Sequence, residues 1–492
     1  MPSASLKRIP TVVIRIALCF LLLLAVVASW AARTPAPAAA AAATPATAPS
    51  AAQSPFANSQ TSPPPNYKGP LFQLSYAYPK SVPTPAMPWR DTLNGQPISK
   101  ETAGAYANAL RQAVSADVQV LVGNYPAWNA AKRGWFNQPW LSAIRDPIHG
   151  MFSATQTPGS LFNDSTLKVN SVNNFAAVYY NATAAVALGN FWGANAMTPN
   201  LTTQAAQFPE GSLIIKLAFT QVTAAQWPIM GESPSWSIFS TWFDDNGNQA
   251  STNTLFPVQL MQIDVIVKDS KAAPKTGWVF TTLVYDNRVK GSFWDRMIPL
   301  GAMWGNDPDV KSSDKPGTNA PLNENWINPA SPAYSVATLG WGGRLSGPND
   351  GSVQAPGQYI DPATGQNGTV PVANSSCMSC HSPAQWPAQS FLLPGTMNSS
   401  NIYYMAVPSS PEWMRWFQDR PGTQAMDNNS FALDYDMMFA FKALPAWAAA
   451  TQQPLNNLHL FMRPGDMLKK LRPARITERK YNGLPLESDK SK

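Results

Sequence analysis

The sequence VQLMQIDVIVKDSKAAPKTGWVFTTLVY occupies residues 258–285. Two runs within it, Val258 to Lys268 and Trp278 to Tyr285, are rich in Val, Ile, Thr and aromatic residues, which favour strands. The polar stretch Asp269 to Thr276 lies between them and has the composition and length of a hairpin loop. The pattern therefore predicts two neighbouring antiparallel strands.

Other segments extend this prediction to a larger fold. The turn sequence FPEGS at 208–212 precedes a third predicted strand, Leu213 to Phe219, which contains Lys216. Helices are predicted at 99–118, where Ser99 can act as the cap, and at 171–188, where apolar residues recur at helical spacing. We predict an α+β fold in which helices flank an antiparallel sheet of three or more strands, with long loops rich in Pro, Gly and Trp.

The most informative motif is Ser375-Ser376-Cys377-Met378-Ser379-Cys380-His381, in the C-terminal third of the chain. Cys-x-x-Cys-His is the pattern of covalent haem attachment. Cysteines at this spacing lie on one side of a single turn, where each sulfur can form a thioether with a haem vinyl group. The histidine that follows is then placed to bind the iron as its axial ligand.

The small number of cysteines strengthens this interpretation. The chain has three, and Cys19 lies in an N-terminal apolar run that we expect to be removed, so Cys377 and Cys380 would be the only two left. A disulfide or redox-active pair is a less favoured alternative, because the motif lies among Gly, Pro, Ser and Asn rather than between a strand and a helix. A zinc site is also less favoured, because it needs four ligands and no second cysteine pair exists.

On Cys377, Cys380 and His381, the chain resembles c-type cytochromes. The resemblance covers a small part of the sequence and implies one covalent haem c, an exported location and redox chemistry. It does not specify the fold.

A second resemblance spans roughly residues 205–385. The order FPEGSLIIK at 208–216, VIVKD at 265–269, Gly277-Trp278 and a later Cys-x-x-Cys-His is similar to that of a β-rich mono-haem family. That family contains hydroxylamine-oxidising cytochromes whose haem is crosslinked to a lysine, and the related gas-binding cytochromes c′-beta. The resemblance implies that Lys216 lies near the haem edge; a lysine that points outward from a half-buried strand is the alternative. The long segment 287–376, and the residues after the motif, depart from the family pattern.

Further candidates for the haem environment come from the residues around the motif. Arg344 has the planar guanidinium that pairs with a carboxylate such as a haem propionate. Met397 and Met405 lie in segments expected to be irregular and are the preferred candidates for a sixth iron ligand, ahead of methionines in predicted helices such as Met438. His149 is a further candidate as a distal ligand or catalytic group; the alternative is a histidine that is packed near a turn. Segment 287–376 is expected to be mainly loop, and its Trp294, Trp304, Trp326 and Trp341 are candidates to pack over a haem face. Helices are expected at 411–418 and 430–450.

The N-terminal region has the features of a secretory signal. Lys7 and Arg8 precede an apolar run, and Ser29-Trp30-Ala31 offers small residues for cleavage. An uncleaved membrane anchor is the alternative. The predicted organisation is a signal peptide or anchor at 1–32, an Ala/Pro-rich linker at 33–68, an α+β domain at 69–300, a haem-binding segment packed on the sheet at 301–462, and a basic tail at 463–492.

Charge and composition bear on location and partners. The chain has 492 residues, of which 13% are charged, 47 are Pro and 18 are Trp, and this is typical of an exported protein with aromatic-packed loops. Its net charge of +7 comes partly from the leader and the tail, and nothing in the pattern predicts nucleic-acid binding. The signal and the haem motif together predict a periplasmic protein, soluble or tethered to the inner membrane.

These observations leave three functions open. The leading hypothesis is electron transfer between periplasmic redox partner proteins through the covalent haem. The alternatives are a haem oxidoreductase that acts on a small nitrogen or oxygen compound at an open iron, and a haem-based gas-binding module. The sequence predicts no catalytic acid or base, because no pair of carboxylates has a setting that suggests tuned acidity.

Overall fold

The computed structural model describes residues 64–72, 75–139, 145–244, 250–311, 322–350, 358–361, 363–370, 373–390, 392–397 and 403–451. The predicted leader, most of the predicted linker and the basic tail lie outside these residues. None of the helices within the described ranges combines the length and the apolar character that a membrane crossing needs.

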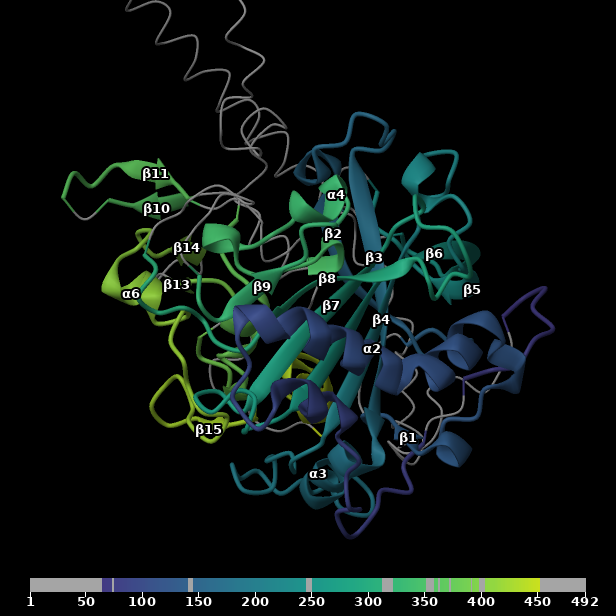
Figure 1. The fold of residues 1–492 in the computed structure, drawn as a ribbon, viewed down its shortest axis with the longest axis horizontal. Helices are drawn as coiled ribbons and strands as arrows, with labels where there is room; N and C mark the ends of the chain where they lie inside the picture. Colours follow the sequence, from purple (N-terminus) through teal and green to yellow (C-terminus); the bar gives the residue numbers. More distant parts are fainter. Residues whose placement is uncertain are drawn as a thin grey trace, which may run out of the picture. The chain divides into compact units, whose positions relative to one another are not determined.

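A nine-stranded antiparallel sheet forms the centre of the described fold (Figure 1). Its strands are β1 (Trp135–Phe136), β2 (Phe152–Pro158), β3 (Ser171–Asn181), β4 (Leu213–Thr220), β5 (Ser235–Ser240), β6 (Thr254–Lys268), β7 (Trp278–Tyr285), β8 (Met297–Met303) and β9 (Asn325–Ile327). The order is β1-β3-β4-β6-β7-β8-β9, with β2 added on β3 and β5 on β6. The fold is α+β, as predicted, and the three strands expected from sequence are β4, β6 and β7.

One face of the sheet is covered by α2 (Lys100–Gly123), the helix that was predicted to begin after Ser99 (Figure 1). Ser99 and Thr102 form a reciprocal capping box, which satisfies backbone N–H groups at the helix start. The buried residues of α2 pack against alternate residues of the strands: Ala103, Tyr106, Ala107, Leu110, Val114, Val118 and Leu121 against Leu213, Ile215, Leu217, Ile263, Val265, Val267, Val279 and Leu283. This face is an apolar core.

The opposite face carries α3 (Ala182–Trp192) and the C-terminal segment. The strand residues on this side belong to a second core, with Ile214, Ile266, Trp278, Phe280 and Val284 packed against Met378 and against Leu433, Tyr435, Phe439, Leu444 and Trp447. Side chains alternate between the two faces of a strand, so residue parity decides which core each strand residue joins.

The prediction of a helix over 171–188 is wrong for residues 171–181. Residues 171–181 form β3 and the helix starts at Ala182, with Asn181 as its cap. Residues 171–180 of β3 are all buried because the strand is covered on both faces, so its apolar residues do not alternate. The apparent helical spacing came from this continuous burial, whereas Val172, Val178, Tyr179 and Tyr180 favour a strand.

The prediction of mainly irregular structure over 287–376 missed β8 and β9. Pro299 and Gly301 are unusual in a strand, so the sequence of β8 was interpreted as loop. The register between β7 and β8 shifts opposite these residues, between Thr282 and Leu283. Strand β8 also crosses residue 300, so the sheet continues into the segment assigned to haem binding.

The remaining elements are short. Apart from the 3₁₀ helices, they are α4 (Ala333–Val336), β10 (Gln358–Ile360), β11 (Asn367–Thr369), α5 (Cys377–His381), β12 (Gln385–Trp386), β13 (Gly395–Met397), β14 (Tyr403–Met405), α6 (Pro411–Met414), β15 (Phe431–Ala432), a π-helix at Phe439–Ala443 and α7 (Leu444–Ala450). The helix predicted over 411–418 is thus only one turn long. In the helix predicted over 430–450, the first residues form the strand β15 instead, and the helical part starts later.

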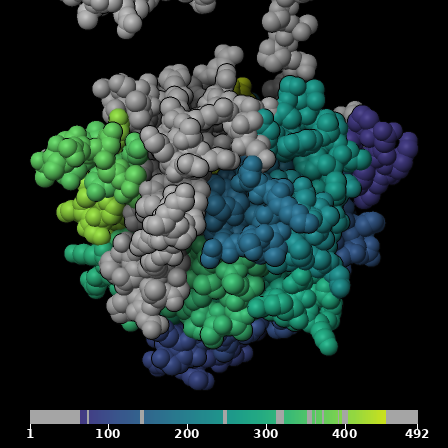
Figure 2. Space-filling model, turned by 90° about the horizontal axis from the view of Figure 1, so that it is seen from above, coloured from purple at the N-terminus to yellow at the C-terminus, as the bar shows by residue number. Residues whose placement is uncertain are grey.

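Seen from above, the surface brings distant parts of the chain together (Figure 2). The blue surface of the β2 region lies beside the green surface of residues beyond 300, and the hydroxyl of Thr155 donates to the carbonyl of Asn349 at 2.8 Å. The loop residues just before Asp350 are therefore anchored on the sheet, close to the residues described next.

Candidate haem site

A stripe of polar residues crosses the second face of the sheet. Lys216 of β4 is paired in register with Asp264 of β6, and Asp264 is paired with Thr282 of β7. Directly opposed residues of antiparallel strands place their side chains on the same face. The Nζ of Lys216 lies 3.2 Å from Asp264 Oδ2, and the Thr282 hydroxyl donates to Asp264 Oδ1 at 2.8 Å. Register alone thus places a cation and a carboxylate on a face that also carries Ile214, Ile266 and Phe280.

Asp350 completes this cluster from outside the sheet. Its Oδ1 lies 2.9 Å from Lys216 Nζ, and Gln262 Nε2 donates to its Oδ2 at 3.2 Å and to both oxygens of Asp264. The two carboxylates share one ammonium, and their charge raises the pKa of Lys216 above its usual value despite burial. Burial raises the pKa of Asp264. Lys216 is therefore held as a cation.

The cysteine motif forms the single helical turn α5, Cys377–His381. Ser376 and Ser379 form a capping box: the Ser376 N–H donates to the Ser379 hydroxyl oxygen at 2.8 Å, and the Ser379 N–H donates to the Ser376 hydroxyl oxygen at 3.2 Å. A cap of this kind contributes about 1 kcal/mol to a helix start. Met378 is fully buried in the second core, so the turn is fixed from below as well.

The segment before the motif is held by the loop at 340–345. The N–H of Trp341 donates to the carbonyl of Ser375 at 2.8 Å, and the N–H of Cys377 donates to the carbonyl of Leu345 at 2.9 Å. A side chain on Gly340 would collide with the Ser375 carbonyl oxygen, so only glycine permits this approach.

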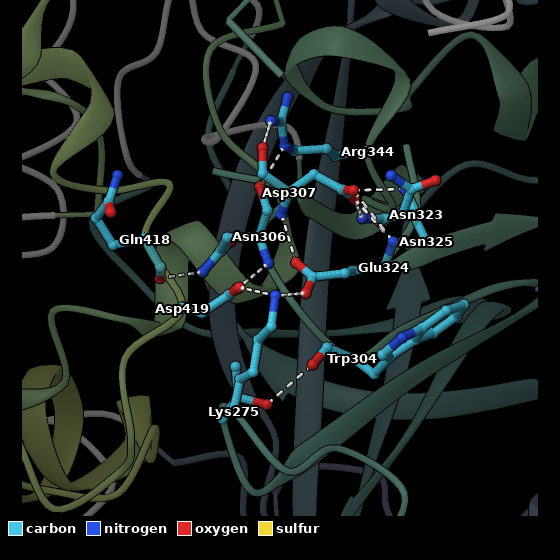
Figure 3. A network of polar contacts seen from close by, with 11 residues as sticks. Lys275, Trp304, Asn306, Asp307, Asn323, Glu324, Asn325, Arg344, Gln418 and Asp419 are labelled. Atoms are coloured by element: carbon cyan, nitrogen blue, oxygen red, sulfur yellow. Dashed lines mark hydrogen bonds and ion pairs between the residues drawn. The ribbon is translucent and has the colours of Figure 1, made fainter. Parts of the chain in front are cut away.

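Arg344 belongs to the same loop and fixes it through a network of polar contacts, which Figure 3 shows. Its guanidinium donates to the carbonyls of Asn306 and Asp307 at 2.8 Å (Figure 3). It also donates to the carbonyls of Val310 at 2.9 Å and Trp341 at 3.0 Å. The side chain is fully buried and does not line the cavity beside the motif. The structure therefore does not bring Arg344 to the position expected of a propionate partner; it positions the loop that holds the motif.

The same network ties Arg344 to the edge of the sheet. Asp307 accepts from backbone and side-chain groups of 323–325, and Lys275 forms ion pairs with Glu324 and Asp419 (Figure 3). Asn325 Oδ1 in turn accepts the Leu345 N–H at 3.0 Å. Strand β9 and the motif loop are thus connected through polar contacts.

His381 is oriented by one hydrogen bond and one ring contact. Its Nδ1 lies 2.7 Å from the carbonyl oxygen of Tyr435, and its ring meets Phe280 edge-on with centroids 4.8 Å apart. A carbonyl can only accept, so Nδ1 carries the proton and Nε2 keeps its lone pair. Burial lowers the pKa of His381 to about 4, so the ring is neutral at pH 7. A neutral imidazole fixed through its other nitrogen is the form that binds metals.

A cavity opens beside His381. Its empty volume is about 1270 Å³ when the open solvent at its mouth is included. Most of its walls are apolar, and polar groups reach it at a few points. The lining includes Phe152, Val178, Ile214, Lys216, Ile266, Trp278, Phe280, Asp350, Cys380, His381, Asp434, Asp436, Met437, Met438 and Lys442.

Both cysteines reach open space on this side of the sheet. Cys380 lines the large cavity, and Cys377 and Cys380 line a smaller one that shares Lys216 and His381 with it. The two thiols are free, and burial raises the pKa of each, with the charge of Asp350 adding to the effect. The structure thus brings together Cys377, Cys380, His381 and Lys216, four of the residues predicted from sequence.

Other predicted residues lie elsewhere. Met405 is buried in a separate cluster with Trp341, Trp413 and Phe417, and does not line the cavity; for Met397 the backbone lies in β13, and its side chain lies outside the described part of the structure. Trp294, Trp304 and Trp326 pack on the α2 face. The tryptophan that lines the cavity is Trp278, whose Nε1 donates to Asp434 at 2.8 Å.

His149 is also remote from the cavity. Its ring stacks on Trp236 with centroids 3.9 Å apart, and it is buried on the α2 side of the sheet. It is a packed core histidine at this place in the fold.

Lys442 was not predicted to be a site residue, and the two methionines of a predicted helix, Met437 and Met438, were less favoured ligand candidates than Met397 and Met405. All three line the cavity on one side of the helical segment after Tyr435. A signal was present in MMFAFKALPAW at 437–447, where one lysine interrupts an apolar run. A charged residue among core-type residues is worth testing as a site group.

Comparison with known proteins adds no relative: no family model, no curated protein and no solved structure matches the chain.

Replacing Gly340 with Ala tests the close contact that positions the motif. The new methyl group must displace the Ser375 carbonyl, so we expect the free energy of unfolding to fall by about 2 kcal/mol, measured by urea denaturation. Gly231→Ala is the matched control, because its nearest new contact, the Pro228 carbonyl oxygen at 3.2 Å, is tight but much less close than the contact at Gly340. Equal stability of the two variants would contradict the proposed contact.

Proposed function

We propose that this protein is an exported mono-haem c-type cytochrome that transfers electrons through one covalent haem, bound by Cys377, Cys380 and His381. The observation that carries the proposal is the cysteine pair on one half-buried turn, next to a neutral histidine whose Nδ1 is already bonded and whose ring lines a largely apolar cavity. We further propose a periplasmic location, with redox proteins as partners.

The residues fit a haem of this kind. The two free thiols stand at the spacing of thioether attachment, and Nε2 of His381 is available as an axial ligand. Apolar side chains such as Ile214, Ile266 and Phe280 suit the macrocycle. When bound, a haem supplies one-electron redox chemistry at its iron.

The choice of electron transfer rests on Met437 and Met438. Both thioethers belong to residues that line the cavity with His381, and a methionine opposite a histidine is the ligand set that raises the potential of electron-carrying cytochromes. They replace Met397 and Met405 as the proposed source of the sixth ligand.

Carbon monoxide tests this ligand set. We expect the absorption spectrum of the reduced protein to be insensitive to carbon monoxide, because a methionine occupies the sixth position. Met437→Ala or Met438→Ala should create a carbon-monoxide-dependent shift, whereas Met405→Ala, in the separate cluster, should not. A shift in the unsubstituted protein would instead favour an open iron, as in the oxidoreductase or gas-binding alternatives.

A haem oxidoreductase acting on a small nitrogen or oxygen compound is the second candidate. The observation in its favour is that titratable groups around the cavity have shifted pKa values: burial raises that of Asp436 to about 6 and lowers that of Lys442 to about 8. Groups tuned toward neutrality inside a cavity are common at sites of proton transfer. The lysine-crosslinked family would fit this function.

Lys216 separates the two candidates. Its ion pairs with Asp264 and Asp350 favour a protonated ammonium, which is a poor group for forming a bond to a porphyrin carbon. We therefore expect trypsin to cleave after Lys216 in the denatured holoprotein, giving a peptide of unmodified mass. Resistance at Lys216, with porphyrin mass on that peptide, would support a crosslink and the oxidoreductase function.

A further inference from the structure

Lys442 is a cation inside the cavity at a place where the helix geometry changes. It lies in the π-helix Phe439–Ala443, between the helical turn at 437–438 and α7. Insertions of this kind re-aim side chains and are frequent at functional sites. Met438, Phe441 and Lys442 all line the cavity, so this side of the helix faces it.

Within the described residues, Lys442 has no carboxylate partner and no hydrogen bond. Its recorded contact is with the ring of Phe152, 4.9 Å from Nζ to the ring centroid. An ammonium in apolar surroundings is costly unless an anion pairs with it, and an aromatic face compensates only in part. Burial, with a smaller effect of the Lys216 charge, lowers the pKa of Lys442 to about 8.

The other charged groups around the cavity already have partners. Asp350 is paired with Lys216, and Asp434 with Lys268 at 2.6 Å. Asp436 accepts from the hydroxyl of Tyr180 at 2.9 Å and from backbone N–H groups at the start of the helical turn. Lys442 is thus the cation of this cavity for which the described protein provides no anion.

We propose that Lys442 recognises an anionic group that enters the cavity beside His381. This inference rests on the proposed function, and it goes further by naming the chemistry of the contact: a carboxylate or a comparably small anion held against the ammonium. Such an anion can come from two sources, a propionate of the bound haem or a separate small anion. The first fits electron transfer, and the second fits a haem oxidoreductase.

The test compares the holoprotein with Lys442→Met, which keeps the length and apolar stem, and with Lys442→Arg, which keeps the charge. Lys290→Met, at an exposed lysine, is the matched control. Each variant is titrated with azide in the oxidised state and with carbon monoxide in the reduced state, and its reduction potential is measured.

If the anion is separate, Lys442→Met should weaken azide binding by about 10- to 100-fold, the range of a lost charged hydrogen bond, and Lys442→Arg should restore much of it. Carbon monoxide is neutral, so its affinity for the open iron of this case should not change. If the anion is a propionate, the substitutions should leave the azide titration unchanged, with no binding where a methionine closes the iron, while the potential falls in Lys442→Met and recovers in Lys442→Arg. Unchanged azide affinity and unchanged potential together would overturn the inference.

Failure of the underlying proposal is distinguishable. An exported protein without haem would refute the proposed function, and calorimetric titration of the colourless protein with azide and with acetate would then test Lys442 alone. Binding that Lys442→Met abolishes would uphold the anion contact without a haem. Equal heats for the unsubstituted protein and Lys442→Met would remove it.

Discussion

The hydrogen bond between His381 Nδ1 and the Tyr435 carbonyl is the interaction on which the site depends. It joins the cysteine turn to a segment that lies 54 residues later in the chain, and it decides which nitrogen of the ring remains free. The contact needs both partners in place: α5 is held by its capping box and by Leu345, and the Tyr435 segment by the second core. Without this bond the ring could rotate, and neither tautomer would be preferred.

The sheet supplies the other half of the site through a simple rule of parity. Along β4, odd-numbered residues enter the core under α2, and Ile214 and Lys216 face the cysteine side. A shift of one residue in the β4–β6 register would bury Lys216 under α2 and expose an apolar face to the cavity. The ion pairs with Asp264 and Asp350 reinforce the register, because a buried ammonium separated from them would be left uncompensated.

The parts of the fold and the site that depend on residues adjacent in sequence were predictable. The cysteine motif and the three strands are contiguous patterns, whereas Lys216 became a candidate only through the resemblance to the β-rich mono-haem family. The role of Arg344 and the identity of the methionines that line the cavity were not predictable, because both depend on which loop packs against which core. Arg344 donates its hydrogen bonds to backbone carbonyls, and Met405 is buried in a separate cluster. Strand β3 was predicted as a helix, because a strand that is buried on both faces does not show the alternation of apolar and polar residues typical of strands. The position of Lys442 in the site became apparent only from the residues that line the cavity.

The central claim is that iron-porphyrin is bonded to the two sulfurs of α5, with His381 beside it. The most direct measurement is the intact mass, under denaturing conditions, of the protein exported from a host that can mature c-type cytochromes. A mass that exceeds the polypeptide by one haem, with Cys377 and Cys380 resistant to alkylation, is the predicted result. A polypeptide mass without haem, together with alkylation of both thiols, would contradict the account.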